Sequence, residues 1–175
     1  MTDAIPPTSE NHAPFPTVGR LAAIDFGTVR IGIALCDPDR ILVSPWEVHT
    51  RGKAEGEAKY FQRLAKEERV AGFIVGLPIH CDGGESQKSG EAREFARWLH
   101  ELTGVPVRMF DERFSTAQAR RRLRSGHWTH KDRKARIDAI AAQILLEAFL
   151  EVSQYTGKVP GQVIDAQDAE NDPLD

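Results

Sequence analysis

Long hydrophobic runs and cysteines are both scarce in this chain of 175 residues. No apolar stretch reaches the roughly 18–20 residues that span a bilayer, so we expect no membrane segment. The first residues lack a basic stretch followed by an apolar one, so we expect no signal peptide. Only Cys36 and Cys81 occur, too few for a disulfide framework. This scarcity favours a reducing, cytoplasmic location.

Three common chemical motifs are also absent from the sequence. It contains no P-loop, no G-x-G-x-x-G and no G-x-S-x-G, the motifs of many nucleotide-binding proteins and serine hydrolases. A histidine pair, His127 and His130, lacks the cysteine or acidic partners of a zinc pattern, and we interpret both as loop residues.

The composition is that of one soluble domain, with 41% hydrophobic and 28% charged residues. The first 19 residues hold four prolines and no Lys or Arg, and the end of the chain is strongly acidic. We therefore predict a disordered head over residues 1–19, a folded domain over 20–152 and an acidic disordered tail over 153–175.

The net charge of −3 conceals a strongly basic segment, residues 113–136. Its nine basic residues, set against Asp132 alone, are Arg113, Arg120, Arg121, Arg122, Arg124, Lys131, Arg133, Lys134 and Arg136. A segment of this kind is typical of surfaces that bind polyanions.

The apolar periodicity predicts an α/β fold. We expect strands over residues 20–26, 30–36, 40–48, 70–77 and 105–110. We expect helices over residues 55–69, over 89–102, from Ser115 onward and over 132–152. Three strands followed by alternating helices and strands predict a mixed five-stranded sheet flanked by helices. Pro45 cannot donate a hydrogen bond, which places the third strand at an edge or ends it there.

Asp25 lies at the end of the first apolar strand. A charge there is costly unless it is paired or bound to a cation. The alternative is an aspartate that caps the following turn through its side chain.

Asp138 lies in a helix whose other polar residues, Gln143 and Glu147, share one stripe. Helical spacing turns Asp138 about 180° away from Glu147, toward the core side. It could bind a cation, compensate the helix dipole or pair with an arginine.

Asp111 and Glu112 follow the fifth strand directly. Because side chains alternate along a strand, only one of the two can face a shared site. We choose Glu112, which is closer to the following loop, and keep Asp111 as the alternative. Taken alone, the pair is explained better by a solvated loop than by a functional site.

Together these carboxylates predict a metal site. Oxygen-only ligands suit Mg²⁺ or Mn²⁺, and two such ions can promote phosphodiester hydrolysis. The basic segment between the second and third carboxylates would then bring a phosphate backbone to the metals.

Four segments, in order, resemble the YqgF family, also called RuvX-like. They are Ala23–Ala34, Val75–Pro78 with the loop Asp82–Gly84, Asp111–Thr116, and Asp138 with Ala141-Ala142 and Ile144-Leu145. The resemblance implies an RNase H-like fold and a nuclease that processes the 5′ end of pre-16S rRNA. It implies Asp25, Glu112 and Asp138 as metal-binding catalytic residues. The expected nucleic-acid-binding residues are Arg30, Arg113, Arg120, Arg121, Arg124, Lys131, Arg133 and Lys134.

Other functions stay open from the sequence. Holliday junction resolution would act on branched DNA and require a homodimer, because a junction is cut at two sites. A non-catalytic RNA-binding factor of ribosome assembly is another alternative. The motif Asp25–Thr28 also resembles the phosphate motif of actin-like ATPases, but one domain cannot build their two-domain cleft.

Overall fold

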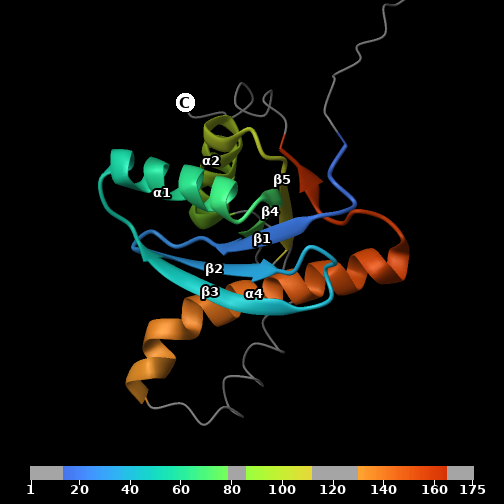
Figure 1. Cartoon of the computed structure of the whole chain (residues 1–175). Coiled ribbons are helices and arrows are strands. Elements are labelled where there is room, and N and C mark those ends of the chain that lie inside the picture. The colour runs from blue at the N-terminus through green and yellow to red at the C-terminus, as the bar shows by residue number, and fades with distance from the viewer. Residues whose placement is uncertain (1–13, 79–85, 112–129, 165–175) are drawn as a thin grey trace, which may run out of the picture.

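The structure is a three-layer α/β domain, described by a computed structural model over residues 14–78, 86–111 and 130–164. One sheet separates helices α1 (Ala54–Glu67) and α2 (Gln87–Thr103) from the long helix α4 (His130–Thr156). Figure 1 shows α1 and α2 on one side of the sheet and α4 across the other. No helix in the described parts of the chain is long and apolar enough to cross a membrane.

The sheet has the strand order β3-β2-β1-β4-β5-β6. The strands are β1 (Arg20–Asp25), β2 (Arg30–Cys36), β3 (Val43–Thr50), β4 (Val70–Leu77), β5 (Val107–Asp111) and β6 (Gln162–Val163). Strands β1, β4 and β5 are parallel, whereas β2, β3 and β6 pair in antiparallel fashion. The predicted mixed sheet is therefore confirmed, and β3, which contains Pro45, is an edge strand as expected.

Side-chain alternation along the strands divides the core in two. On β1, Ala22 and Ile24 pack into the core beneath α1 and α2. Leu21 and Ala23 belong to the core that α4 covers. This alternation matters for the site, because it places the side chain of Asp25, the next odd-numbered residue, on the α4 side of the sheet.

The close packing of α4 on the sheet depends on a glycine in β2. A Cβ atom at Gly32 would overlap the backbone carbonyl of Asp138. The helix therefore approaches the strand at a distance that only a residue without a side chain permits. Gly32 is also the cross-strand partner of Asp25.

The folded part of the chain extends past both predicted boundaries. Phe15, which we assigned to a disordered head, is buried and packs against Phe149 of α4. Helix α4 continues to Thr156 rather than ending at 152, and β6 adds a sixth strand within the predicted tail. The third strand also runs over Val43–Thr50 rather than 40–48. The helix expected from Ser115 lies outside the described residues.

The turn between β2 and β3 is held by one aspartate. The carboxylate of Asp37 accepts hydrogen bonds from the backbone N–H groups of Ile41 at 2.8 Å and Leu42 at 2.6 Å. The Leu42 hydrogen bond is the main reason why the pKa of Asp37 lies below its usual range.

We predict that Asp37→Ala lowers the melting temperature at neutral pH and that this difference narrows in acid. The folded-state pKa lies below the unfolded one, so the stabilisation exists above the unfolded pKa and is lost as pH falls through the folded value. Melting curves from pH 7 to pH 2.5 test this, with the neighbouring exposed Asp39→Ala as the control. A difference independent of pH would contradict the prediction.

Candidate active site

The candidate site lies at the edge of the sheet where the parallel strands end. The carboxyl ends of β1, β4 and β5 meet there, and β2 begins there. Helix α1 follows the end of β3, so it also begins at this edge. In open α/β sheets, ligands bind beyond the carboxyl ends of such strands.

Asp25 is the last residue of β1 and is partly exposed. It lines a cavity of 340 Å³ whose other lining residues are Phe26, Gly27, Thr28, Pro78, Lys88 and Glu91. Gly27 allows the tight turn that follows, because a Cβ atom there would overlap the carbonyl oxygen of Arg30. The sequence therefore holds Asp25 at a sharp strand–turn junction open to solvent.

Asp138 approaches the same region from α4. Its backbone carbonyl lies against Gly32, the cross-strand partner of Asp25. The Arg30 Nε donates a hydrogen bond to the Asp138 Oδ2 at 2.9 Å. Pairing with an arginine, one of the alternatives left open for Asp138, is thus observed, and the arginine is one that we expected to bind nucleic acid.

Asp111 faces the other side of the sheet. It pairs in register with Leu77, and Leu77 belongs to the core beneath α1 and α2. Phe110, one residue earlier, points into the α4 core. This alternation separates the side chain of Asp111 from the face that carries Asp25 and Asp138. This placement counts against Asp111 as a ligand shared with Asp25 and Asp138. Glu112, the residue that we chose, lies outside the described residues and stays a prediction.

Most of the predicted nucleic-acid-binding residues cannot be placed. Arg113, Arg120, Arg121 and Arg124 lie outside the described residues. The backbone of Lys131, Arg133 and Lys134 belongs to the first turns of α4, with side chains that the structure does not describe. Of this set, only Arg30 has a described side chain; it is 46% exposed beside the candidate site.

Two residues of α2 at this edge were missed by the sequence interpretation. Lys88 and Glu91 line the Asp25 cavity from the first turns of the helix. The N-cap Ser86 accepts a hydrogen bond from the Ser89 backbone N–H and fixes where this helix begins. The sequence signal for both residues was their position near the expected start of the helix over 89–102.

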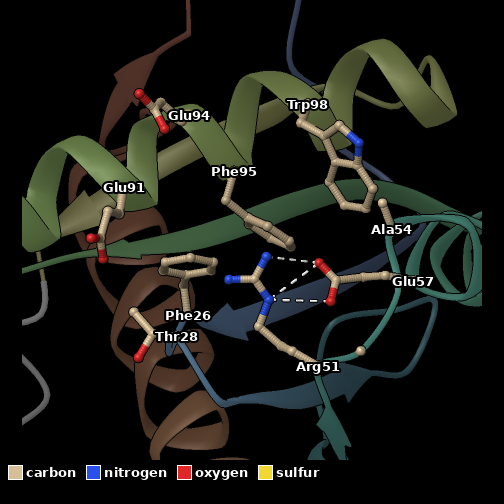
Figure 2. Close-up of a pocket in the computed structure, with 10 residues that line it drawn as sticks. Phe26, Thr28, Arg51, Ala54, Glu57, Glu91, Glu94, Phe95 and Trp98 are labelled. Carbon is tan, nitrogen blue, oxygen red and sulfur yellow. Dashed lines mark hydrogen bonds and ion pairs between the residues drawn. The ribbon is translucent and has the colours of Figure 1, made fainter.

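A second cavity, shown in Figure 2, shares Phe26, Thr28 and Glu91 with the first. It has a volume of 460 Å³ and contains the guanidinium of Arg51. Arg51 Nε and Nη2 donate hydrogen bonds of 2.9–3.2 Å to the buried carboxylate of Glu57. Two donors on one carboxylate fix the orientation of the guanidinium plane.

The donors of the site fit a hard divalent cation. Asp25 is the register partner of Gly32, and the backbone of Asp138 packs against Gly32, so both residues that carry carboxylates lie in this region. Carboxylate oxygens are ligands that Mg²⁺ and Mn²⁺ prefer. Within the described ranges, no group of three or more His, Cys, Asp or Glu residues could hold a metal. Any third carboxylate from the predicted set would be Glu112.

Comparison with known proteins identifies the family. A family model described as RuvX, Holliday junction resolvase, matches residues 19–152. A Rhodopirellula baltica protein named "Putative pre-16S rRNA nuclease" is 58% identical over 86% of this chain and 87% of its own length. A Koribacter versatilis protein of the same name is 36% identical over 76% of this chain and 87% of its own length. The chain belongs to the RuvX family, which confirms the resemblance noted from its motifs.

Solved structures support the fold assignment. The structure of Thermus thermophilus RuvC in complex with Holliday junction substrate matches with a TM-score of 0.53 at 13% identity. The match covers 82% of this chain and 99% of that chain. At this identity the likeness concerns the fold alone, and it confirms the predicted RNase H-like architecture.

Proposed function

We propose that this protein is a metal-dependent nuclease that hydrolyses phosphodiester bonds in structured RNA at the 5′ end of pre-16S rRNA, in the cytoplasm. The observation that carries the proposal is that Gly32 pairs with Asp25 in the sheet and packs against the backbone of Asp138, at the edge where the parallel strands end. The relatives named for pre-16S rRNA support the choice of substrate.

In this proposal Asp25, Asp138 and Glu112 hold the divalent cations, Mg²⁺ or Mn²⁺. Bound there, such ions activate water and stabilise the charge on the leaving oxygen. The protein residues position the cations and the phosphate. Arg30 keeps the Asp138 carboxylate oriented and is exposed enough to contact a substrate phosphate.

Positive groups beside the carboxylates of the site would contact a polyanion. Lys88 lines the Asp25 cavity, and helices α1 and α2 both begin at this edge, where their dipoles favour anions. The basic segment 113–136 adds charge next to Asp111 in the chain. Its arginines would contact the phosphate backbone, which fixes position without reading sequence.

Cleavage of a pre-16S rRNA fragment beside a four-way DNA junction tests the proposal, with Mg²⁺ and Mn²⁺ assayed separately. We expect metal-dependent cleavage of the RNA, abolished by EDTA. Preferred cutting of the junction would instead establish the second candidate, a Holliday junction resolvase, which the description of the family model favours. That activity would require a homodimer, detectable by sedimentation. Binding to RNA with no cleavage under either metal would favour a non-catalytic assembly factor.

We predict that Arg30→Gln lowers the metal concentration needed for half-maximal cleavage and raises the KM for RNA. The substitution removes the cation that neutralises Asp138, so the carboxylate attracts a metal ion more strongly, and it also removes a phosphate contact. Because both side chains of the pair are partly exposed, stability should change by less than about 1 kcal/mol. Metal titrations of cleavage test this, with Lys66→Gln at the far end of α1 as the control. An unchanged metal requirement would contradict it.

A further inference from the structure

Three neighbouring cavities at the site edge share lining residues, and together they are called the groove. The Asp25 cavity shares Phe26, Thr28 and Glu91 with the 460 Å³ cavity. That cavity shares Gly52 and Glu57 with a third one of 530 Å³ along α1. The groove therefore leads from the candidate active site, past the start of α2, to the start of α1.

The middle cavity is walled by aromatic rings and a fixed guanidinium plane. The ring centroids of Phe26 and Phe95 are 4.8 Å apart, and those of Phe95 and Trp98 are 5.4 Å apart. The Arg51 guanidinium lies 5.0 Å from the Phe26 centroid and is held there by Glu57 (Figure 2). Proteins bind unpaired bases by stacking them on such rings and guanidinium planes. A volume of 460 Å³ lies within the range of small-ligand sites.

The charges of the middle cavity select a base rather than a phosphate. Arg51 compensates Glu57, which leaves Glu91 and Glu94 of α2 as net negative lining groups. Carboxylates repel phosphates but accept hydrogen bonds from the exocyclic amino groups of bases. Glu91 lines both the Asp25 cavity and the middle cavity, so it lies where an amino group of the neighbouring nucleotide would arrive.

The charged side chains that line the third cavity are mainly positive, unlike those of the middle cavity. Lys53, Lys59 and Arg63 line it, together with Gly52 and Gly56 at the start of α1. Lys59 forms an exposed pair with Glu55 at 2.7 Å, whereas no side chain caps the N-terminus of the helix. Cationic side chains around an uncapped helix start favour a phosphate group.

We propose that this groove binds an unpaired strand of the substrate next to the bond that is cut. One base, bearing an amino group, enters the middle cavity against Phe26, Arg51 and Trp98 and donates to Glu91. The phosphates that follow lie over Lys53 and Arg63. The proposal rests on the nuclease function above, because that function places the reacting phosphate at Asp25.

Binding of short RNA tests the base site separately from cleavage. Full-length Asp25→Asn protein without metal is titrated with fluorescent oligocytidine and oligouridine tetramers. Cytosine presents an amino group where uracil presents a carbonyl, so we expect oligocytidine to bind about tenfold more tightly. Glu91→Gln should abolish this preference, because an amide both donates and accepts, whereas Glu101→Gln on the exposed part of α2 should retain it. Equal binding of the two oligomers, or a preference that survives Glu91→Gln, would overturn the base site.

The salt dependence of oligonucleotide binding tests the proposed phosphate contacts with Lys53 and Arg63 along α1. Each phosphate contact on a single strand contributes about 0.7 to the slope of log K against log salt. The double variant Lys53→Ala with Arg63→Ala should reduce that slope by about 1.4, while Lys66→Ala leaves it unchanged. An unchanged slope in the double variant would overturn the proposal that phosphates contact Lys53 and Arg63.

The two proposals fail in different ways. Base preference without cleavage in the wild-type protein would overturn the nuclease function and leave the groove standing. Cleavage without base preference would overturn the groove proposal and leave the nuclease function standing.

Discussion

Replacing Asp25 by asparagine will reduce metal-dependent cleavage about a thousandfold or more while the protein remains folded. The substitution keeps the shape of the side chain but removes the negative charge that holds a divalent cation at the end of β1. Because asparagine has nearly the same volume as aspartate and Asp25 is only partly buried at the strand end, the variant should remain folded at ordinary temperatures. Single-turnover cleavage assays and melting curves measure the two effects.

Asp39→Asn provides the matched control, because Asp39 is an exposed aspartate in the β2–β3 turn, away from the site edge. It should cleave like the wild type. Asp138→Asn should match the loss caused by Asp25→Asn. Substantial cleavage by the folded Asp25 variant would show that the chemistry does not depend on this carboxylate.

The strands and helices that the sequence predicted well are those with a clear apolar period. Runs such as 70–77 leave few alternatives to a buried strand, and β4 covers Val70–Leu77 as expected. Strand β6 has only two residues, Gln162 and Val163, both exposed. No periodicity exists in so short a segment, and its position depends on pairing with Arg108 and Met109 of β5. The burial of Phe15 likewise depends on the space above Gly72, which local sequence does not reveal.

Helical spacing predicted the side of its helix on which Asp138 lies, but not its partner. The face of the sheet on which Asp25 lies follows only from the structure, in which Leu21 and Ala23 of β1 belong to the core beneath α4. The ion pair between Arg30 and Asp138 joins residues that are 108 positions apart, and no local pattern selects that arginine. The family resemblance suggested Arg30 as a phosphate ligand, but not that it first holds a carboxylate.

The groove could not be predicted from the sequence either, because its lining residues come from separate segments of the chain. Its aromatic wall combines Phe26 after β1 with Phe95 and Trp98 of α2, and its guanidinium plane comes from the residue after β3. In the sequence, the pattern that predicts a helix over 89–102 does not distinguish Phe95 and Trp98 as residues that line a cavity. Their position in the cavity wall depends on the packing of α2 against the turn that follows β1.

Gly32→Ala will destabilise the protein and also impair the site. A Cβ atom at this position overlaps the carbonyl of Asp138, and both partners are backbone held within regular structure. Helix α4 must therefore move away from β2, at a cost of about 3 kcal/mol. For a domain of this size, that corresponds to a fall in melting temperature of about 6–12 °C.

Because the displaced residue is Asp138, the molecules of Gly32→Ala that remain folded should also cleave poorly at temperatures well below the transition. Gly90→Ala is the matched control: nothing lies within 4 Å of a Cβ atom there, and the residue is within α2. Alanine at position 90 should stabilise the helix by about 0.5–1 kcal/mol. The same substitution therefore changes the free energy of unfolding in opposite directions at the two positions. Urea unfolding gives the free energies, and cleavage per folded molecule gives the effect on the site. A Gly32 variant as stable and as active as the wild type would mean that α4 does not need this close approach to position Asp138.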